Sequence, residues 1–190
     1  MFSLLFNEVI LTRQYVLGDS STTYGGKRAA NGRKEPWEVS IVEIGNEDNL
    51  GGGCESYPER FMAYYEAISK VYPDLTFIAS TDNSSCLPKD LPEGVWLDWH
   101  TYDTPEGLVS DFDKFDNQDR KVPYFIGEYS RQEGDWPDMK GSVSEAVFMI
   151  GLERNSDVVK MAAYAPLLQL VNSTQWTVSS FHQRLRSSVG

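Results

Sequence analysis

The segments Ile44-Gly45-Asn46-Glu47 and Ile126-Gly127-Glu128 close two apolar runs of the chain in the same way. In each, a glycine and then a glutamate stand where a predicted strand meets its loop. In parallel β/α folds the carboxyl ends of the strands form the ligand-binding face, so two such carboxylates can converge on a substrate. A single glutamate at a strand end is usually only a solvated side chain. Two glutamates in matching contexts favour a functional site.

The pattern around these segments alternates between strand and helix. Helical spacing of apolar residues runs from Phe61 to Tyr72 and stops at Pro73. A second helix is predicted after Thr104, an N-cap candidate, and a third from Ser142. Short apolar runs, typical of parallel strands covered on both faces, predict strands at 39–44, 75–80, 95–99, 124–126 and 158–164. The alternation predicts an α/β fold with a parallel sheet and leaves a doubly wound sheet and a β/α barrel as alternatives. The segment through Gly18 resembles the end of a helix.

The composition narrows the classes of partner. With 190 residues, the chain has about the length of one domain. Its 17 basic and 28 acidic side chains give a net charge of −11, which argues against nucleic acid or an anionic membrane as a partner.

No apolar stretch is long enough to span a bilayer, and residues 1–6 lack the basic start of a signal peptide. Cys54 and Cys86 could form one disulfide or lie unpaired in loops, and the second interpretation is favoured. Glycosylation triplets begin at Asn83 and Asn172.

The candidate chemistry is that of paired carboxylates. Two carboxyl groups with different roles are the machinery of glycoside hydrolysis, in which one protonates the leaving oxygen and the other attacks or activates water. A third strand end carries His100 and Tyr102 on one face, and Tyr102 could donate a hydrogen bond to a nucleophilic carboxylate. The sequence contains no metal-ligand cluster, no Gly-x-Ser-x-Gly elbow and no phosphate-binding glycine motif. Nucleotide chemistry and a metal centre are therefore not expected.

Several motifs, in one order, are similar to a known family. They are Val42-Glu43-Ile44-Gly45-Asn46-Glu47-Asp48, the helix at 57–72 with Pro73-Asp74, His100-Thr101-Tyr102, Phe125-Ile126-Gly127-Glu128-Tyr129, and the segment at 151–159. Together they resemble the catalytic domain of glycoside hydrolase family 51, the α-L-arabinofuranosidases of fungi and plants. The resemblance runs from about Tyr15 to Trp176. A series of motifs in order is more specific than any single one.

The resemblance implies roles for individual residues. Glu47 would be the general acid/base and Glu128 the nucleophile of a retaining mechanism. Asn46 would bind the sugar 2-hydroxyl, Tyr102 would orient Glu128, and His100 would line the sugar subsite. A further substrate-binding residue would be Trp176, after the last strand. The resemblance implies no cofactor or metal, an arabinose-containing polysaccharide or oligosaccharide as partner, and secretion.

The length of the chain limits this interpretation. A complete (β/α)8 barrel has about 250 residues, so the resemblance implies a partial barrel at residues 1–176 with roughly strands four to eight. On this interpretation, residues 177–190 are expected to form a divergent tail, without the family's C-terminal β-sandwich. Exposed sheet edges would make the chain poorly soluble or oligomeric. The alternatives are an inactive fragment with at most weak sugar binding, and a related xylosidase or endoglucanase.

Overall fold

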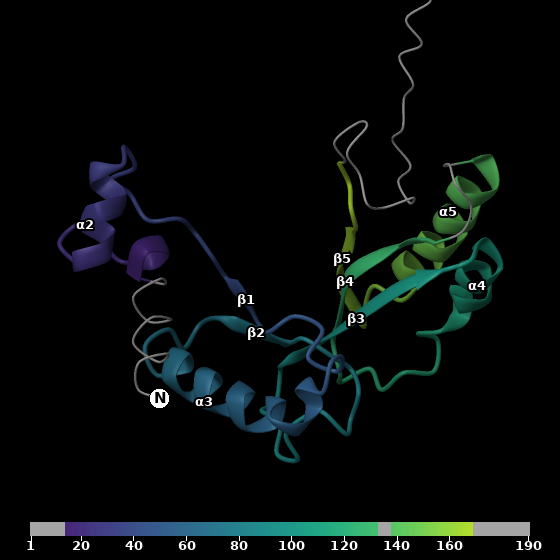
Figure 1. Ribbon diagram of the computed structural model, residues 1–190, viewed down its shortest axis with the longest axis horizontal. Coiled ribbons are helices and arrows are strands. Elements are labelled where there is room, and N and C mark those ends of the chain that lie inside the picture. Colours follow the sequence, from purple (N-terminus) through teal and green to yellow (C-terminus); the bar gives the residue numbers. More distant parts are fainter. Residues whose placement is uncertain (1–13, 133–137, 169–190) are drawn as a thin grey trace, which may run out of the picture. The chain divides into compact units, whose positions relative to one another are not determined.

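The computed structural model describes residues 14–132 and 138–168 (Figure 1). The chain divides into two compact units, with the boundary between Val95 and Trp96. Each unit is a set of parallel strands joined by helices, as the alternating pattern predicts. In the described part of the chain, no helix has both the length and the apolar character needed to cross a membrane.

The first unit is built around one β-α-β crossover. Strand β1 (Ile41–Ile44) pairs in parallel with β2 (Thr76–Ala79), and helix α3 (Tyr57–Ser69) connects them. The helix buries Tyr57, Phe61 and Ile68. A series of ring contacts runs from Phe61 through Tyr65 to Phe77 on β2, which packs the helix against the strand pair. The parallel strands and the helix at 57–69 confirm the predicted pattern.

The sequence pattern missed one helix, α2 (Thr23–Ala30). Thr22 caps it by accepting a hydrogen bond from the Gly25 amide. Arg28 is fully buried, and its guanidinium donates to the carbonyls of Tyr15, Gly18 and Lys34. A charged residue at a buried position hides the apolar face by which helices are recognised. Helical backbone at residues 14–17 agrees with the predicted helix end before Gly18.

A buried tyrosine continues the β1–β2 pairing beyond its last backbone contact. The Tyr57 hydroxyl donates to the Ile44 carbonyl at 2.6 Å and accepts from the Ser80 amide at 2.7 Å. These two backbone groups follow the final register pair of the two strands. The side chain thus satisfies a carbonyl and an amide that would otherwise be buried without partners.

Tyr57 makes the first unit sensitive to alkali. Burial raises the pKa of its phenol to about 12, the carboxylates of Asp48 and Glu43 add to the rise, and the hydrogen bond from Ser80 opposes it. A phenol whose pKa is higher in the folded state stabilises that state fully below its unfolded pKa, near 10, and this contribution is lost as pH rises toward 12. A shift of this size corresponds to about 3 kcal/mol.

We therefore expect Tyr57→Phe to flatten the pH dependence of the unfolding free energy between about pH 10 and about pH 12. At neutral pH the variant should lose about 1–3 kcal/mol, because Ile44 and Ser80 lose their partner. Urea melts across this pH range measure both effects. Tyr64→Phe, on the same helix, is the control and should keep the parent pH dependence. An equally steep alkaline decline in Tyr57→Phe would contradict the assignment.

The first unit also contains a disulfide. Cys54 and Cys86 are bonded, with their Cα atoms 4.4 Å apart, so the interpretation of two unpaired loop cysteines is wrong. The bond joins the loop after β1 to the segment after β2, across a sequence separation of 32. Closing a loop of this length stabilises a fold by about 3–4 kcal/mol on the chain-entropy model. The sequence could not show the pairing, because helix α3 is what brings the two loops together.

In its described residues, the second unit contains three parallel strands, β3 (Trp96–Asp103), β4 (Tyr124–Arg131) and β5 (Val159–Tyr164), with β4 in the centre. Helices α4 (Pro105–Ser110) and α5 (Met139–Arg154) pack against each other beside β3 and β4 (Figure 1). The core between helices and strands is aromatic, with Phe148 in contact with both Trp99 and Tyr129. Its fully buried apolar members include Leu108, Phe115, Ile126, Phe148 and Val158.

The ends of β3 and β4 and the start of α5 differ from the sequence prediction. β3 and β4 continue past the predicted ends at 99 and 126, so the polar residues that follow are part of the strands. Helix α5 starts at Met139 and not at Ser142, because the Asp138 carboxylate caps it by accepting from the Gly141 amide at 2.7 Å. The Thr104 cap of α4 is confirmed, since its hydroxyl accepts from the Gly107 amide.

Candidate active site

The first predicted glutamate lies in a tight loop at the carboxyl end of β1. Gly45 has φ +105°, and a methyl group there would lie 2.0 Å from Oδ2 of Asp48. Only glycine therefore fits between the strand and the following carboxylate. Glu47 has φ +50°, a left-handed conformation that is unfavourable for a residue with a side chain. Such strain persists where the surrounding contacts impose it, and it is concentrated at functional sites.

The second predicted glutamate lies within β4, in the other unit. The register of β3 against β4 shifts between Asp98 and His100, so that His100 stands directly opposite Glu128. An irregularity of this kind redirects side chains and is common beside active sites. The Tyr102 hydroxyl donates to Oε2 of Glu128. His100 Nδ1 lies 3.8 Å from the same oxygen.

A buried aspartate contacts both His100 and the backbone beside Glu128. Asp98 is 2% exposed, its Oδ2 lies 2.6 Å from Nε2 of His100, and its Oδ1 accepts from the Gly127 amide at 2.7 Å. A methyl group at Gly127 would lie 2.5 Å from Oδ1 of Asp98, so the glycine beside Glu128 is required by this carboxylate. Asp98 thus connects the histidine of β3 to the backbone next to Glu128. Sequence reasoning missed it, although an aspartate inside the apolar run Trp96-Leu97-Asp98-Trp99 was a usable signal.

The predicted site residues fall into two groups. Asn46 and Glu47 share the loop after β1 in the first unit. His100, Tyr102 and Glu128 come together in the second unit, as described above. Trp176 lies outside the described residues. Each group occupies the carboxyl end of parallel strands, which is where ligands bind in β/α folds.

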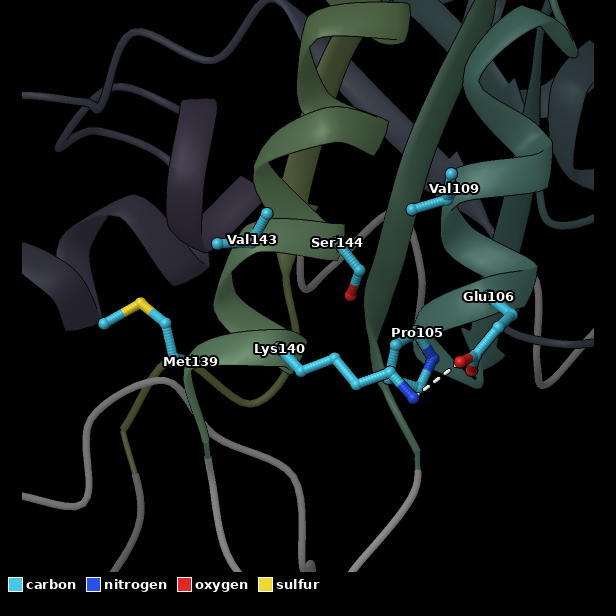
Figure 2. Close-up of a pocket in the computed structure, with 7 residues that line it drawn as sticks. All are labelled: Pro105, Glu106, Val109, Met139, Lys140, Val143 and Ser144. Carbon is cyan, nitrogen blue, oxygen red and sulfur yellow. Dashed lines mark ion pairs between the residues drawn. The ribbon is translucent and has the colours of Figure 1, made fainter.

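The second unit also has an apolar groove between α4 and α5 (Figure 2). Val109, Val143 and Met139 line it, and an ion pair between Lys140 and Glu106, 2.5 Å apart, crosses one end. Of the predicted site residues that the structure describes, none is among its lining residues. Glu106 and Lys140 are the charged residues among its described lining residues, and they form an ion pair with each other.

A glutamate in the carboxyl-terminal half of a parallel strand, with a tyrosine hydroxyl donating to it, is an arrangement suited to the nucleophile of glycoside hydrolysis. Comparison with known proteins agrees with this class. The family model described as "Alpha-L-arabinofuranosidase 1 domain" matches residues 5–120, and that described as "Alpha-L-arabinofuranosidase C-terminal domain" matches residues 111–183. The chain belongs to the α-L-arabinofuranosidases of glycoside hydrolase family 51.

Individual relatives show how much of such a protein the chain represents. It is 74% identical to the probable α-L-arabinofuranosidase A of Aspergillus terreus and 71% identical to α-L-arabinofuranosidase A of Aspergillus kawachii. Both matches cover 90% of this chain and 27% of the relative. The chain therefore spans about a quarter of the length of these curated relatives.

Solved structures extend the comparison to the fold. An arabinose-bound family 51 α-L-arabinofuranosidase matches with a TM-score of 0.81 and 35% identity, over 90% of this chain and 29% of that one. The arabinose-complexed α-L-arabinofuranosidase of Thermotoga maritima matches at 0.69 and 20% identity, over 85% and 41% of the two chains, which shows a shared fold. The predicted parallel β/α architecture is thereby confirmed. The numbering of the strands as four to eight of a barrel stays a prediction.

Proposed function

We propose that the chain is part of the catalytic domain of a retaining, exo-acting α-L-arabinofuranosidase. Its substrates are the terminal L-arabinofuranosyl groups of arabinoxylan- or arabinan-type hemicellulose. The observation that carries the proposal is the contact of Tyr102 with Glu128 at the carboxyl end of β4, in a chain of this family. A donor fixed on one carboxylate oxygen leaves the other oxygen to act as the nucleophile.

The reaction proceeds in two displacements. In the first, the Glu128 carboxylate forms a bond to the anomeric carbon while the bond to the leaving oxygen breaks, and Glu47 gives that oxygen its proton. In the second, Glu47 takes a proton from water, which attacks the same carbon and frees Glu128. Two inversions at one carbon give net retention.

The remaining predicted residues bind the sugar. Asn46 donates to the 2-hydroxyl, an interaction that strengthens in the transition state. His100 lines the subsite, where its contact with Asp98 fixes the orientation of the ring. Trp176 contributes an apolar surface on which a sugar can stack. We also propose the division into a partial barrel at 1–176 and a divergent tail at 177–190.

Secretion belongs to the same proposal. The bond between Cys54 and Cys86 supports it, because disulfides persist in oxidising compartments and are rare in the cytosol. An extracellular location also suits a polymeric plant substrate that does not enter the cell.

A chimera tests the proposal, because the chain spans 27% of its relatives. The chain would replace the matching segment of the Aspergillus kawachii enzyme, to which it is 71% identical. Proton NMR of the first product released from an aryl α-L-arabinofuranoside should show the α anomer before mutarotation. A β product would contradict retention. A soluble, folded chimera without activity, beside an active parent, would favour the alternative of an inactive chain.

A further inference from the structure

We propose that Asp48 is the positioning residue of the acid/base glutamate, and that Ser80 and Arg60 hold it in place. This inference rests on the proposed function, since it assumes that Glu47 donates the proton. Asp48 follows Glu47 directly, yet its side chain turns back past the loop toward the end of β2.

The contacts of Asp48 use both carboxylate oxygens. Oδ2 accepts from the Asn46 amide at 3.1 Å and from the Ser80 hydroxyl at 2.8 Å. Oδ1 forms an ion pair with the guanidinium of Arg60 on α3. The Asp48 side chain is 11% exposed, and its hydrogen bond with the Ser80 hydroxyl is partly buried. One carboxylate thereby joins the loop, the end of the neighbouring strand and the following helix.

The backbone of Glu47 is restrained on both sides by hydrogen bonds. The residue before it is held through its amide by Asp48, and the Glu47 carbonyl accepts from the Leu50 amide at 2.9 Å. Glu47 itself has the left-handed φ of +50°, which an unrestrained loop would abandon. Because the backbone dihedrals set the direction of the Cα–Cβ bond, the contacts of Asp48 help to fix the position and direction from which the Glu47 side chain starts.

The direction matters because a general acid must lie within hydrogen-bond reach of the atom that it protonates. A displacement of about 1 Å can lower a rate by about 100-fold. Asparagine at position 48 has the shape of aspartate but only one acceptor oxygen, so its amide would face either the donors at Asn46 and Ser80 or the guanidinium of Arg60. The substitution therefore loosens the loop without opening a cavity.

The experiment measures kcat/KM of the chimera on aryl α-L-arabinofuranosides whose leaving groups increase in basicity. A misplaced acid affects basic leaving groups most, because acidic phenols depart without a proton. We expect Asp48→Asn to lose about 10- to 100-fold on the most basic leaving group and less than about threefold on the most acidic. Ser80→Ala, which removes the two hydrogen bonds of the Ser80 hydroxyl with Asp48 and leaves the Arg60 ion pair, should show a smaller change in the same direction. Asp74→Asn, at an exposed aspartate of the same unit, is the matched control.

The pattern of losses across the variants separates the possibilities. An equal loss on all leaving groups in both Asp48→Asn and Ser80→Ala would mean a merely structural role, and parent rates would mean no role, so either result overturns the inference. If Glu47→Ala lacks leaving-group dependence, the acid/base assignment itself fails. If Glu47→Ala shows leaving-group dependence and Asp48→Asn and Ser80→Ala do not, only the proposed role of Asp48 is wrong. Thermal melts establish whether each variant is folded. If Asp48→Asn does not fold, the test is made with Ser80→Ala.

Discussion

Glu128→Ala should lower kcat/KM of the chimera by about four orders of magnitude or more, on activated and unactivated aryl arabinofuranosides alike, as expected for removal of a group that forms the covalent intermediate. The loss does not depend on the leaving group, because alanine offers no atom to attack the anomeric carbon. External azide should restore turnover and give the β-configured arabinosyl azide, since a small anion can occupy the space of the missing carboxylate and attack once.

The control for this experiment is Glu153→Ala, which removes an exposed glutamate of α5 in the same unit. It should keep the parent rate. Activity of Glu128→Ala within about tenfold of the parent would contradict the nucleophile assignment. An azide product of α configuration would do the same, because it would require a second covalent step.

Glu47→Ala is expected to have the second largest effect, and a different signature. General acid catalysis contributes about 10²- to 10⁴-fold, so basic leaving groups should lose that factor while the most acidic lose little in the first step. With the most acidic leaving groups the glycosyl-enzyme should accumulate, because no base activates water. Azide needs no base, and it should release the α-configured arabinosyl azide. Rates on the leaving-group series, with and without azide, provide the measurement.

Glu66→Ala serves as the control in the first unit, since Glu66 is exposed on α3. The opposite azide configurations of the two glutamate variants distinguish the roles without reference to rate. If Glu47→Ala also gave the β azide, Glu47 would not be the acid/base. The same would follow if the kcat/KM of this variant fell by an equal factor on every leaving group.

The strands were predictable from their apolar centres and not at their polar ends. The predicted run at 75–80 has the apolar centre Phe77-Ile78-Ala79, and β2 at Thr76–Ala79 lies within it. β4 continues through Glu128 to Arg131, but its polar residues break the apolar pattern, and the prediction stops at 126. Residues that face a site are polar for a chemical reason, so hydrophobic periodicity is weakest where function lies.

The candidate residues were predictable by type, and their supports were not. The motif around Glu128 marks the glutamate, the strand end at Tyr102 predicts a hydrogen bond to a nucleophilic carboxylate, and the family resemblance identifies that carboxylate as Glu128. The role of Asp98 depends on a contact with the Gly127 amide across two strands, which no local spacing encodes. The bond between Cys54 and Cys86 was missed for the same reason, since it depends on how α3 folds back.

The first turn of α3 has a meaning for how this motif can be moved between proteins. Tyr57 ties the last carbonyl of β1 to the segment after β2, and Arg60, one turn later, holds Asp48. The sequence Gly-Asn-Glu-Asp is therefore not sufficient by itself to form this loop. Grafting these four residues onto another β/α scaffold would transfer the carboxyl group without the contacts that position it. The first turn of α3 and Ser80 would have to be transferred with them.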